Sequence, residues 1–285
     1  MQKIRTRFAP SPTGYLHIGG LRTALFSYLW AKKNKGEFII RIEDTDRARL
    51  IANADQELID TLAKLGINSD VAIKHQSDRL ALYQKASDKL IDNNNAYRCF
   101  CSPERLDEMR TKQQKNKQVP KYDRHCLNLS KEEIDKKIVA GQKFVVRFKI
   151  PDNEIIVGQD AVYGKISIKG QDLDDFVILK SNKFPTYHLA SVVDDHDMRI
   201  SHVIRGEEWM PSLPKHILIY EALKYALPTF VHLPLLLNPD KSKLSKRQGD
   251  VAVEDYLKKG YLIEALLNYV ALLGWNPGNN KEFFI

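Results

Sequence analysis

The sequence contains little cysteine and no long apolar run. Three cysteines in 285 residues cannot all pair with one another, so we do not expect a disulfide scaffold. The first residues, Met1-Gln2-Lys3, lead into an alternating segment and not into the apolar core of a signal peptide. No apolar segment approaches the length of a membrane span, and we therefore expect a cytoplasmic protein with no membrane partner.

The composition is that of a folded, basic protein. Apolar residues make up 43% of the chain, which is enough for a hydrophobic core, and the length suits about two domains. The formal net charge is +8 and the pI is ≈ 9.2. This balance favours a polyanionic partner such as nucleic acid, although an ordinary soluble surface can have the same excess of basic residues.

The first quarter of the chain has the pattern of one βαβ unit. Ile4, Thr6 and Phe8 alternate with basic residues, which predicts a strand. After a turn at PSPTG, apolar residues recur at helical spacing from Ile18, and we expect Gly36 to end that helix. The segment EFIIRIEDTD predicts a second strand. Two strands joined in this way are typical of a nucleotide-binding α/β fold.

A histidine and two glycines stand where the predicted helix begins. Gly19 and Gly20 fall in its first turn, where backbone amides lack partners within the helix and attract anions. Without side chains at these positions a phosphate can approach the backbone, and His17 can donate a hydrogen bond to it. A tight turn beside an exposed histidine would explain the same residues, so this stretch alone leaves both interpretations open.

A second basic motif stands late in the chain. The loop NPDKSKLSKRQGD follows the apolar segment FVHLPLLL, and by itself it is typical of solvated surface. Together with the histidine and glycine helix start, it resembles the two signature motifs of class I aminoacyl-tRNA synthetases. The segments RFAPSPTGYLHIGGLRTALF, RIEDTDRAR, PTYHLASVVDDHDM, HVIRGEEW and KLSKRQGD stand in the order seen in glutamyl-tRNA synthetases. The chain therefore resembles the catalytic N-terminal portion of that family.

The resemblance implies a fold class and a division of the chain. The fold would be α/β, a Rossmann-like parallel sheet that is split by an α+β insertion binding the tRNA acceptor end. The start of a helical region contacting the tRNA stem would follow. We expect the catalytic halves at residues 1–80 and 181–240, the insertion at 81–180, and the KLSKR loop with the first stem-contact helices at 241–285. We also expect a monomer.

The resemblance also implies a two-step reaction. The α-carboxylate of L-glutamate attacks the α-phosphate of ATP to give glutamyl-adenylate and pyrophosphate, and a ribose hydroxyl at the 3′ end of tRNA(Glu) then accepts the glutamyl group. Neither step needs an enzyme nucleophile, so catalysis would rest on positioning and on charge stabilisation, with help from Mg²⁺. The residues expected at the catalytic centre are His17, Gly19, Gly20, Lys243 and Lys246.

Further residues match the family's substrate contacts. The expected glutamate pocket contains Arg7, Ala9, Ser11, Glu43, Tyr187, Ser191 and Arg205. Many relatives carry an asparagine where this chain has Ser191. The expected ATP contacts are His17, Gly19, Gly20, Glu208, Trp209, Leu235, Leu236, Lys243, Ser245 and Lys246. Each has a structural alternative, because strand-end arginines often pair with neighbouring acids, and a tryptophan or leucine is often ordinary core.

All three cysteines fall in one short segment of the expected insertion. Cys99 and Cys101 are separated by one residue, and 24 residues stand between Cys101 and Cys126. In a cytoplasmic protein this clustering favours a structural Zn²⁺ over a disulfide. Buried thiols without a metal are the structural alternative.

The sequence offers more than one candidate for the fourth zinc ligand. Family members with this arrangement often carry a histidine two positions after the last cysteine, where this chain has Asn128. Relatives that use a tyrosine place it four positions before the last cysteine, which corresponds to Tyr122 here. We therefore expect Tyr122 to be the ligand, with His125 or water as the alternative.

Two other functions are compatible with these motifs. One is the shorter relative that glutamylates the queuosine base of tRNA(Asp), which has the same fold and a different acceptor. The intact KLSKR loop and the segment GYLIEALLNYVALLGW are closer to the full-length synthetase. The other is a synthetase-like tRNA binder without activity, which we would expect to have lost His17, Lys243 or Lys246.

Overall fold

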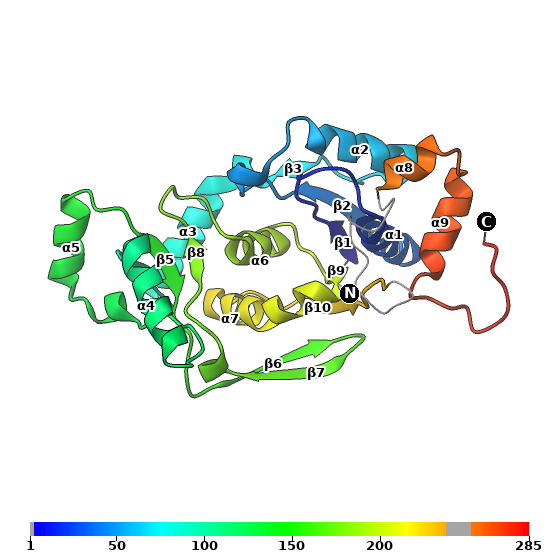
Figure 1. Ribbon diagram of the computed structural model, residues 1–285. Coiled ribbons are helices and arrows are strands. Elements are labelled where there is room, and N and C mark those ends of the chain that lie inside the picture. The colour runs from blue at the N-terminus through cyan, green and yellow to red at the C-terminus, as the bar shows by residue number, and fades with distance from the viewer. Residues whose placement is uncertain (1–2, 238–251, 285) are drawn as a thin grey trace.

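The computed structural model describes residues 3–237 and 252–284 and is built around a mainly parallel sheet (Figure 1). The sheet has seven strands in the order β3-β2-β1-β9-β10-β6-β7. They are β1 (Arg5–Phe8), β2 (Glu37–Ile42), β3 (Lys74–His75), β6 (Ile155–Asp160), β7 (Gly164–Lys169), β9 (His202–Gly206) and β10 (Thr229–Leu233). Neighbouring strands are parallel except for β6 and β7, which form an antiparallel hairpin at one edge.

Helices cover both faces of this sheet. The helices of the described chain are α1 (Ile18–Lys33), α2 (Ala54–Lys64), α3 (Leu80–Asp92), α4 (Pro103–Lys115), α5 (Lys131–Val139), α6 (Tyr187–Asp197), α7 (Leu213–Leu223), α8 (Val253–Lys258) and α9 (Ile263–Leu272). Short 3-10 turns are η1 (Arg47–Arg49), η2 (Gln76–Arg79), η3 (His125–Asn128), η4 (Gly170–Asp172) and η5 (Glu207–Ser212). Within the described residues, no helix is long and apolar enough to cross a membrane.

Alternate side chains of β2 point into two different cores. Ile39 packs in a cluster with residues of α3, α6 and α7, whereas Phe38 and Ile40 pack with residues of α1, α2, α8 and α9. Burial on both faces is expected for a parallel strand covered by helices. The strand-helix-strand unit predicted from the first quarter of the sequence is confirmed, and the Rossmann-like parallel sheet is confirmed with it.

A second, smaller sheet is formed by strands that follow β3 and precede β9 in the sequence. Its three antiparallel strands are β4 (Ala96–Cys99), β5 (Val145–Phe148) and β8 (Val177–Leu179), in the order β4-β5-β8. Helices α4 and α5 lie beside it at one end of the molecule (Figure 1). Val146, Phe148 and Ile178 from this sheet belong to the same apolar cluster as α6 and α7. The small sheet therefore shares its core with the main sheet.

The hairpin of β6 and β7 differs from the expected division of the chain. It lies within residues 81–180, which we expected to form the insertion, yet β6 pairs with β10 and extends the main sheet. The side chain of Ile156 is buried in the cluster that contains Leu213 and Ile217 of α7. A Cβ on Gly158 would lie 2.7 Å from Ile217 Cδ1, so the strand lies very close to that helix. Packing against α7 thus explains why the hairpin joins the main sheet.

The C-terminus of α1 also differs from the prediction. The residue with a left-handed backbone is Lys35, with φ of 51°, whereas Gly36 has no positive φ. The Gly36 N–H donates to Ala31 O at 2.8 Å and the Lys35 N–H donates to Lys32 O at 3.1 Å, which closes the helix. A Cβ on Gly36 would lie 2.2 Å from the carbonyl oxygen of Ile4. Gly36 is therefore required by the close approach of β1.

These two neighbouring residues give opposite expectations for stability. Gly36→Ala should lower the free energy of unfolding by about 2 kcal/mol or more, because the methyl group would collide with the backbone of β1. Lys35→Gly should raise it by about 0.5–1 kcal/mol, because glycine adopts the left-handed conformation without strain. Urea unfolding of both variants measures the difference. A near-neutral Gly36→Ala with a destabilising Lys35→Gly would contradict this assignment.

Candidate active site

The start of α1 has the geometry of an anion-binding helix terminus. His17 caps the helix, and its Nδ1 accepts the backbone N–H of Gly19 at 3.0 Å. Gly19 and Gly20 lie in the first turn, which confirms the predicted helix start. A Cβ on Gly20 would lie 3.2 Å from Leu16 Cδ1, so space there is limited. Because Nδ1 accepts this hydrogen bond, it carries no proton, and the ring proton lies on Nε2.

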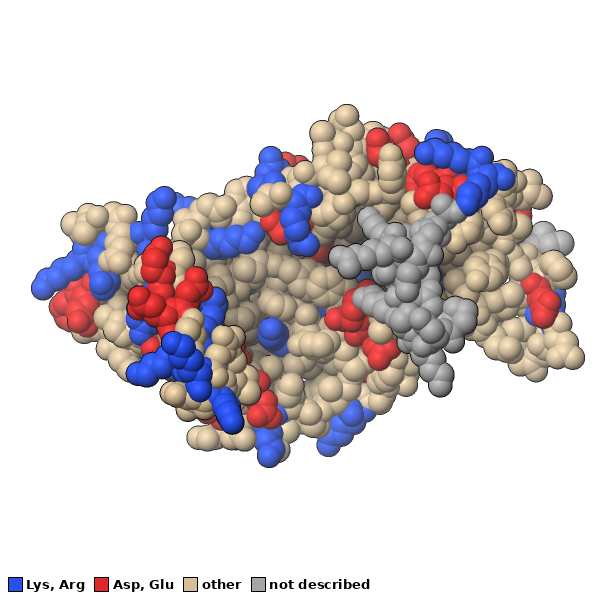
Figure 2. All heavy atoms as spheres, viewed as in Figure 1, with Lys and Arg blue, Asp and Glu red and all other residues tan. Residues whose placement is uncertain are grey.

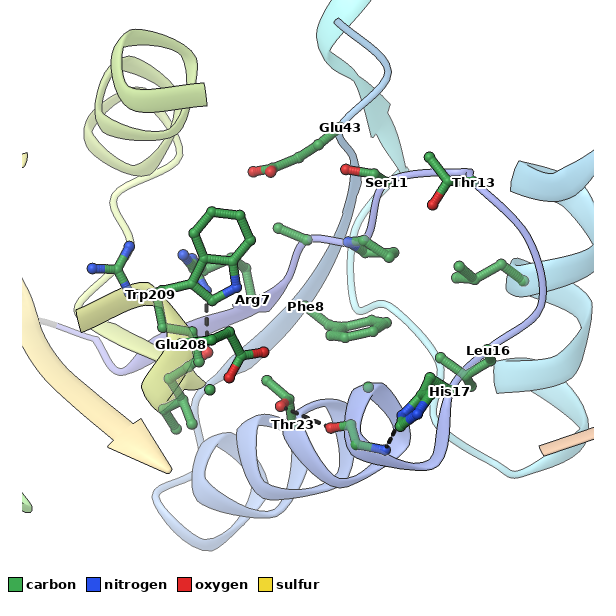
Figure 3. Close-up of a pocket in the computed structure, with 18 of the residues that line it drawn as sticks. Arg7, Phe8, Ser11, Thr13, Leu16, His17, Thr23, Glu43, Glu208 and Trp209 are labelled. Atoms are coloured by element: carbon green, nitrogen blue, oxygen red, sulfur yellow. Dashed lines mark hydrogen bonds between the residues drawn. The ribbon is translucent and has the colours of Figure 1, made fainter. Parts of the chain in front are cut away.

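A cavity of ≈ 350 Å³ opens beside this helix start (Figure 3). Glu43 and Ser11 lie along one side of it, and His17 and Thr23 lie along the other. Trp209 is 39% exposed and also lines the cavity, so it is not ordinary core. The predicted residues that line the cavity are Arg7, Ala9, Ser11, His17, Gly19, Gly20, Glu43, Tyr187, Arg205, Glu208 and Trp209.

A second cavity of ≈ 280 Å³ adjoins the first at the same helix start. The two share His17, the two glycines and Glu208 in their walls. Leu235 and Leu236, both predicted ATP contacts, line only this second cavity. The start of α1 therefore lies between two cavities. The first is lined by charged residues that include Arg7, Glu43 and Arg205, and the second is lined in part by Leu235 and Leu236.

Some predicted residues are not brought to the cavities. Ser191 lies one turn after Tyr187 on α6 and is fully buried, and it is not among the residues lining either cavity. Its Oγ has no hydrogen-bond partner among the described residues. Lys243, Ser245 and Lys246 lie outside the described residues.

Arg7 lies at the end of β1 and is only 4% exposed. Its Nε and Nη2 donate to the two carboxylate oxygens of Asp195 at 3.1 and 3.4 Å, and its Nη1 donates to the Ile204 carbonyl at 3.2 Å. The pairing with an acid that we considered as the structural alternative is therefore present, even though Arg7 lines the cavity. Much of its charge is already neutralised by Asp195.

Arg41 holds Glu43 at the edge of the cavity. This arginine is fully buried on β2 and donates to Glu43 Oε1 at 2.9 Å and to Asp195 Oδ1 at 2.7 Å. Burial raises the pKa of the Glu43 carboxyl, and the positive charge of Arg41 opposes that rise. Asp194, the next residue along α6, accepts hydrogen bonds from Gln76, Arg79 and Tyr83. The end of α6 is thus joined to the sheet by buried charged groups.

Arg205 has a different environment from Arg7 and Arg41. It lies on β9 and is 4% exposed, and among the described residues no carboxylate is within salt-bridge distance of it. Its Nε donates to His232 Nε2 at 3.0 Å, and its Nη1 donates to the Tyr187 hydroxyl at 3.0 Å and to His216 Nδ1 at 3.2 Å. Its Nη2 is buried without a partner among those residues. The Arg205 guanidinium is therefore a cation surrounded by neutral groups.

The histidines around Arg205 are held in their neutral forms. Burial, followed by the charges of Lys215 and Arg205, lowers the pKa of His188 to about 3. Burial and the charge of Arg205 hold the pKa of His216 well below its ordinary value. His188 Nδ1 and His216 Nε2 are 3.3 Å apart, so one of these two rings donates to the other.

The three cysteines lie together as predicted. Their sulfur atoms all lie within 4.8 Å of one another, and the Sγ atoms of Cys101 and Cys126 are 3.5 Å apart. The Tyr122 hydroxyl lies 3.3 Å from Cys99 Sγ and 3.3 Å from Cys101 Sγ. A tetrahedral zinc ion separates its sulfur ligands by about 3.8 Å, so this donor set fits zinc. His125 is exposed and is not among the grouped metal-binding atoms.

Several residues around the cavities were missed by sequence reasoning. Arg22 lines the second cavity, is 4% exposed, and donates to the carbonyl oxygens of Pro234 and Leu273. Asp195 contacts Arg7 from 188 positions away along the chain, whereas His216 and His232 contact Arg205 from 11 and 27 positions away. The acidic pair in SVVDDHDM was a local signal for Asp195, since two adjacent acids on an otherwise apolar helix need buried partners.

Comparisons with known proteins agree on one family. Residues 3–285 match the family described as tRNA synthetases class I (E and Q), catalytic domain. The glutamate--tRNA ligase of Prosthecochloris aestuarii is 54% identical, over 98% of this chain and 58% of that protein. The corresponding ligase of Alkaliphilus metalliredigens is 50% identical, over 100% of this chain and 61% of that protein. The chain thus spans less than two thirds of the length of these relatives.

A solved structure shows the same arrangement of the chain. The crystal structure of a glutamate tRNA ligase from Elizabethkingia meningosepticum, in complex with its amino acid, superimposes with a TM-score of 0.94 at 40% identity. The superposition covers 99% of this chain and 63% of that one.

The neutral histidines predict how stability depends on pH. In the unfolded chain a histidine binds a proton near pH 6.5, whereas His188 and His216 stay neutral in the folded protein. The unfolded state therefore binds more protons below about pH 6.5, and stability should fall by about 1.4 kcal/mol per pH unit for each histidine. Urea unfolding between about pH 6.5 and pH 5 measures the slope. His188→Gln should reduce the slope, and an unchanged slope would contradict the assignment.

Proposed function

Because the chain belongs to the class I tRNA synthetases of the glutamate and glutamine type, we propose that it activates L-glutamate with ATP and charges tRNA(Glu). The observation that carries this proposal is the Arg205 guanidinium, which reaches the cavity without a carboxylate partner among the described residues. An unpaired buried cation is costly, and a bound carboxylate would remove most of that cost. The cavity therefore favours a ligand that presents a carboxylate to Arg205.

Glutamate fits the charges around this cavity when its side chain points towards Arg205. The Glu43 carboxylate lines the cavity and suits the ammonium group of the amino acid. Arg7 is largely neutralised by Asp195, so it would add a weaker attraction than Arg205. In this orientation the α-carboxylate is left to meet ATP near the start of α1.

ATP is proposed to occupy both sides of the helix start. The adenine would lie against Leu235 and Leu236 in the second cavity, and the phosphates would meet His17 and the amides of the first turn. Mg²⁺ would neutralise charge on the phosphates, and the Glu208 carboxylate in the wall of both cavities is an oxygen ligand of the kind that it prefers. Lys243, Ser245 and Lys246 are proposed to stabilise the departing pyrophosphate.

The acceptor end of the tRNA is proposed to contact the segment that carries α4 and α5. Figure 2 shows basic and acidic side chains interspersed on that end of the molecule. The basic residues of α4 are Arg105, Arg110, Lys112 and Lys115. Phosphate contacts of this kind give an affinity that falls as the salt concentration rises.

Glutamate binding tests the role assigned to Arg205. Arg205→Gln should weaken the binding of L-glutamate by about 2–3 kcal/mol, because it removes the charge that faces the substrate carboxylate. Isothermal titration calorimetry of the purified chain measures this. Arg5→Gln is the matched control, because Arg5 lies at the other end of β1 and pairs with Glu37. Equal losses in both variants would contradict the role of Arg205.

The proposed reaction is tested by ATP–pyrophosphate exchange. We expect exchange that depends on L-glutamate and on added tRNA(Glu), since glutamate activation in this family generally waits for tRNA. L-Glutamine should not replace L-glutamate, because its neutral amide leaves the Arg205 charge unpaired. Strong exchange without tRNA would instead favour the enzyme that modifies queuosine, and no exchange under any condition would favour a tRNA binder without activity.

We also propose a structural Zn²⁺ held by Cys99, Cys101, Tyr122 and Cys126. The Tyr122 hydroxyl lies close to two of the sulfurs, which supports it as the fourth ligand over His125. Zinc at this site would link β4 to the segment around η3, because its four ligands come from these two places. Such binding contributes on the order of 10 kcal/mol to ordering a small element.

Elemental analysis tests the zinc site. We expect one zinc per chain in the purified protein, and almost none in Cys99→Ser. Loss of a residue that contacts a zinc ligand lowers zinc affinity by about tenfold or more. Tyr122→Phe removes a ligand itself, so it should weaken zinc binding by at least as much. His125→Gln is the matched control and should bind zinc normally. No zinc in the parent protein would end the proposal, and loss in His125→Gln alone would move the fourth ligand to that residue.

A further inference from the structure

Arg205 is held on its far side by a histidine of the apolar segment FVHLPLLL, to which the sequence analysis assigns no role. His232 lies on β10, is fully buried, and its Nε2 accepts a hydrogen bond from Arg205 Nε at 3.0 Å. Its other ring nitrogen, Nδ1, lies 2.7 Å from Asp160 Oδ2. Asp160, His232 and Arg205 thus form a continuous series from the edge hairpin to the cavity.

Asp160 uses its two carboxylate oxygens for different purposes. It is the last residue of β6 and is 1% exposed. Its Oδ1 accepts the backbone N–H groups of Val162 and Tyr163, both at 2.9 Å, which holds the turn of the hairpin. Its Oδ2 accepts the backbone N–H of His232 at 3.2 Å as well as the ring nitrogen. Burial raises the pKa of Asp160, but these hydrogen bonds outweigh burial and lower it, so the carboxylate is ionised.

The ionised carboxylate determines which nitrogen of His232 carries the proton. An ionised carboxylate can only accept, so His232 must donate to it from Nδ1. Burial and the charge of Arg205 lower the pKa of His232 despite the opposing effect of Asp160, so the ring is neutral and has a single proton. Its Nε2 is then a lone-pair acceptor, which is what the Nε–H of Arg205 requires.

These contacts hold the guanidinium group in one orientation. His232 binds Nε, while Tyr187 and His216 bind Nη1. A planar group held on these two nitrogens has no freedom to rotate, so the position of Nη2 is set as well. This is the nitrogen that lacks a partner among the described residues.

We propose that Asp160 and His232 are positioning residues, which orient Arg205 so that Nη2 faces the substrate carboxylate in the cavity. The inference rests on the proposed function, since it assumes that the cavity binds an acidic amino acid. The role of the edge hairpin would be to place the Asp160 carboxylate beside His232, because β6 pairs with β10 at Asp160. Selection of the side-chain carboxylate would then depend on a residue that lies on a different strand from Arg205.

Asp160→Asn is the most informative substitution. If the side-chain oxygen of the new asparagine still accepts from Val162 and Tyr163, its NH₂ group must face His232 Nδ1. His232 then accepts at Nδ1 and carries its proton on Nε2. The N–H groups of His232 Nε2 and Arg205 Nε would therefore face each other. We expect the dissociation constant of L-glutamate to rise about ten- to a hundredfold, as for loss of a hydrogen bond to a charged group. ATP binding, measured in a separate titration, should change by less than about twofold.

A double-mutant cycle with His232→Gln tests whether Asp160 acts through His232. The side-chain oxygen of glutamine can accept from Arg205 Nε without help from Asp160, so the glutamate affinity of His232→Gln, whatever its value, is the reference for the second substitution. In that background Asp160→Asn should change glutamate affinity by less than about twofold. The same loss in both backgrounds would show that Asp160 acts only by holding the hairpin, and would overturn the proposal.

Asp175→Asn is the matched control for removing a buried carboxylate. Asp175 is 2% exposed and accepts hydrogen bonds from Tyr97, Arg124 and the backbone of Ile150, away from the cavity. It should lower the free energy of unfolding without changing glutamate affinity. A loss of glutamate affinity equal to that of Asp160→Asn would mean that general destabilisation explains both, which would overturn the proposal.

Nitrogen-15 NMR of the histidine rings separates this inference from the proposed function, because it needs no substrate. In the parent protein we expect His232 to show a protonated Nδ1 and an unprotonated Nε2, and the reverse in Asp160→Asn. The expected tautomers without glutamate binding would contradict the proposed function and leave the tautomer assignment intact. A protonated Nε2 in the parent protein would overturn the positioning role, even if the chain activates glutamate.

Discussion

Burial of arginine side chains at the carboxyl ends of the parallel strands is the constraint on which the site depends. Arg7 and Arg41 come from the neighbouring strands β1 and β2, and Arg7 is 4% and Arg41 0% exposed. Charged groups are tolerated in such places only when they are paired. Asp195 accepts hydrogen bonds from both, so one carboxylate on α6 joins that helix to two strands. Arg7 and Glu43, which line the cavity, are thereby held by ion pairs, and Arg7 keeps little positive charge for a ligand.

Arg205 departs from this arrangement, and we propose that its unpaired charge gives the cavity its selectivity. Its hydrogen-bond partners are a tyrosine and two histidines, and burial together with the arginine's own charge keeps those histidines neutral. The same protein interior therefore contains arginines neutralised by carboxylates and, in Arg205, an arginine whose hydrogen-bond partners are all neutral. Arg22, in the wall of the second cavity, likewise donates to neutral backbone carbonyls. A carboxylate ligand supplies the missing charge, whereas a neutral amide does not. The start of α1 adds a place for phosphate next to this cation, so the two cavities favour different anionic groups.

Local patterns in the sequence predicted secondary-structure elements, but they did not predict which side chains far apart in the sequence contact each other. Alternation predicted β1, and the cap at His17 with its two glycines predicted the start of α1, because these features depend only on adjacent residues. Arg7 and Arg205 were found through their motifs, but the motifs did not distinguish the paired arginine from the unpaired one. That difference depends on Asp195, which is 188 positions from Arg7 along the chain. Residues 155–169 were assigned to the insertion for a similar reason, since their position along the chain does not show that β6 pairs with β10 of the main sheet.

We propose that Arg205 Nη2, which has no partner among the described residues, binds the side-chain carboxylate of the substrate. A crystal structure of this chain with L-glutamate tests it most directly, because it places each end of the amino acid. We expect a side-chain carboxylate oxygen within hydrogen-bond distance of Arg205 Nη2, with the ammonium group beside Glu43. A glutamate whose side-chain carboxylate contacts only Arg7, with Arg205 Nη2 still unpartnered, would contradict it.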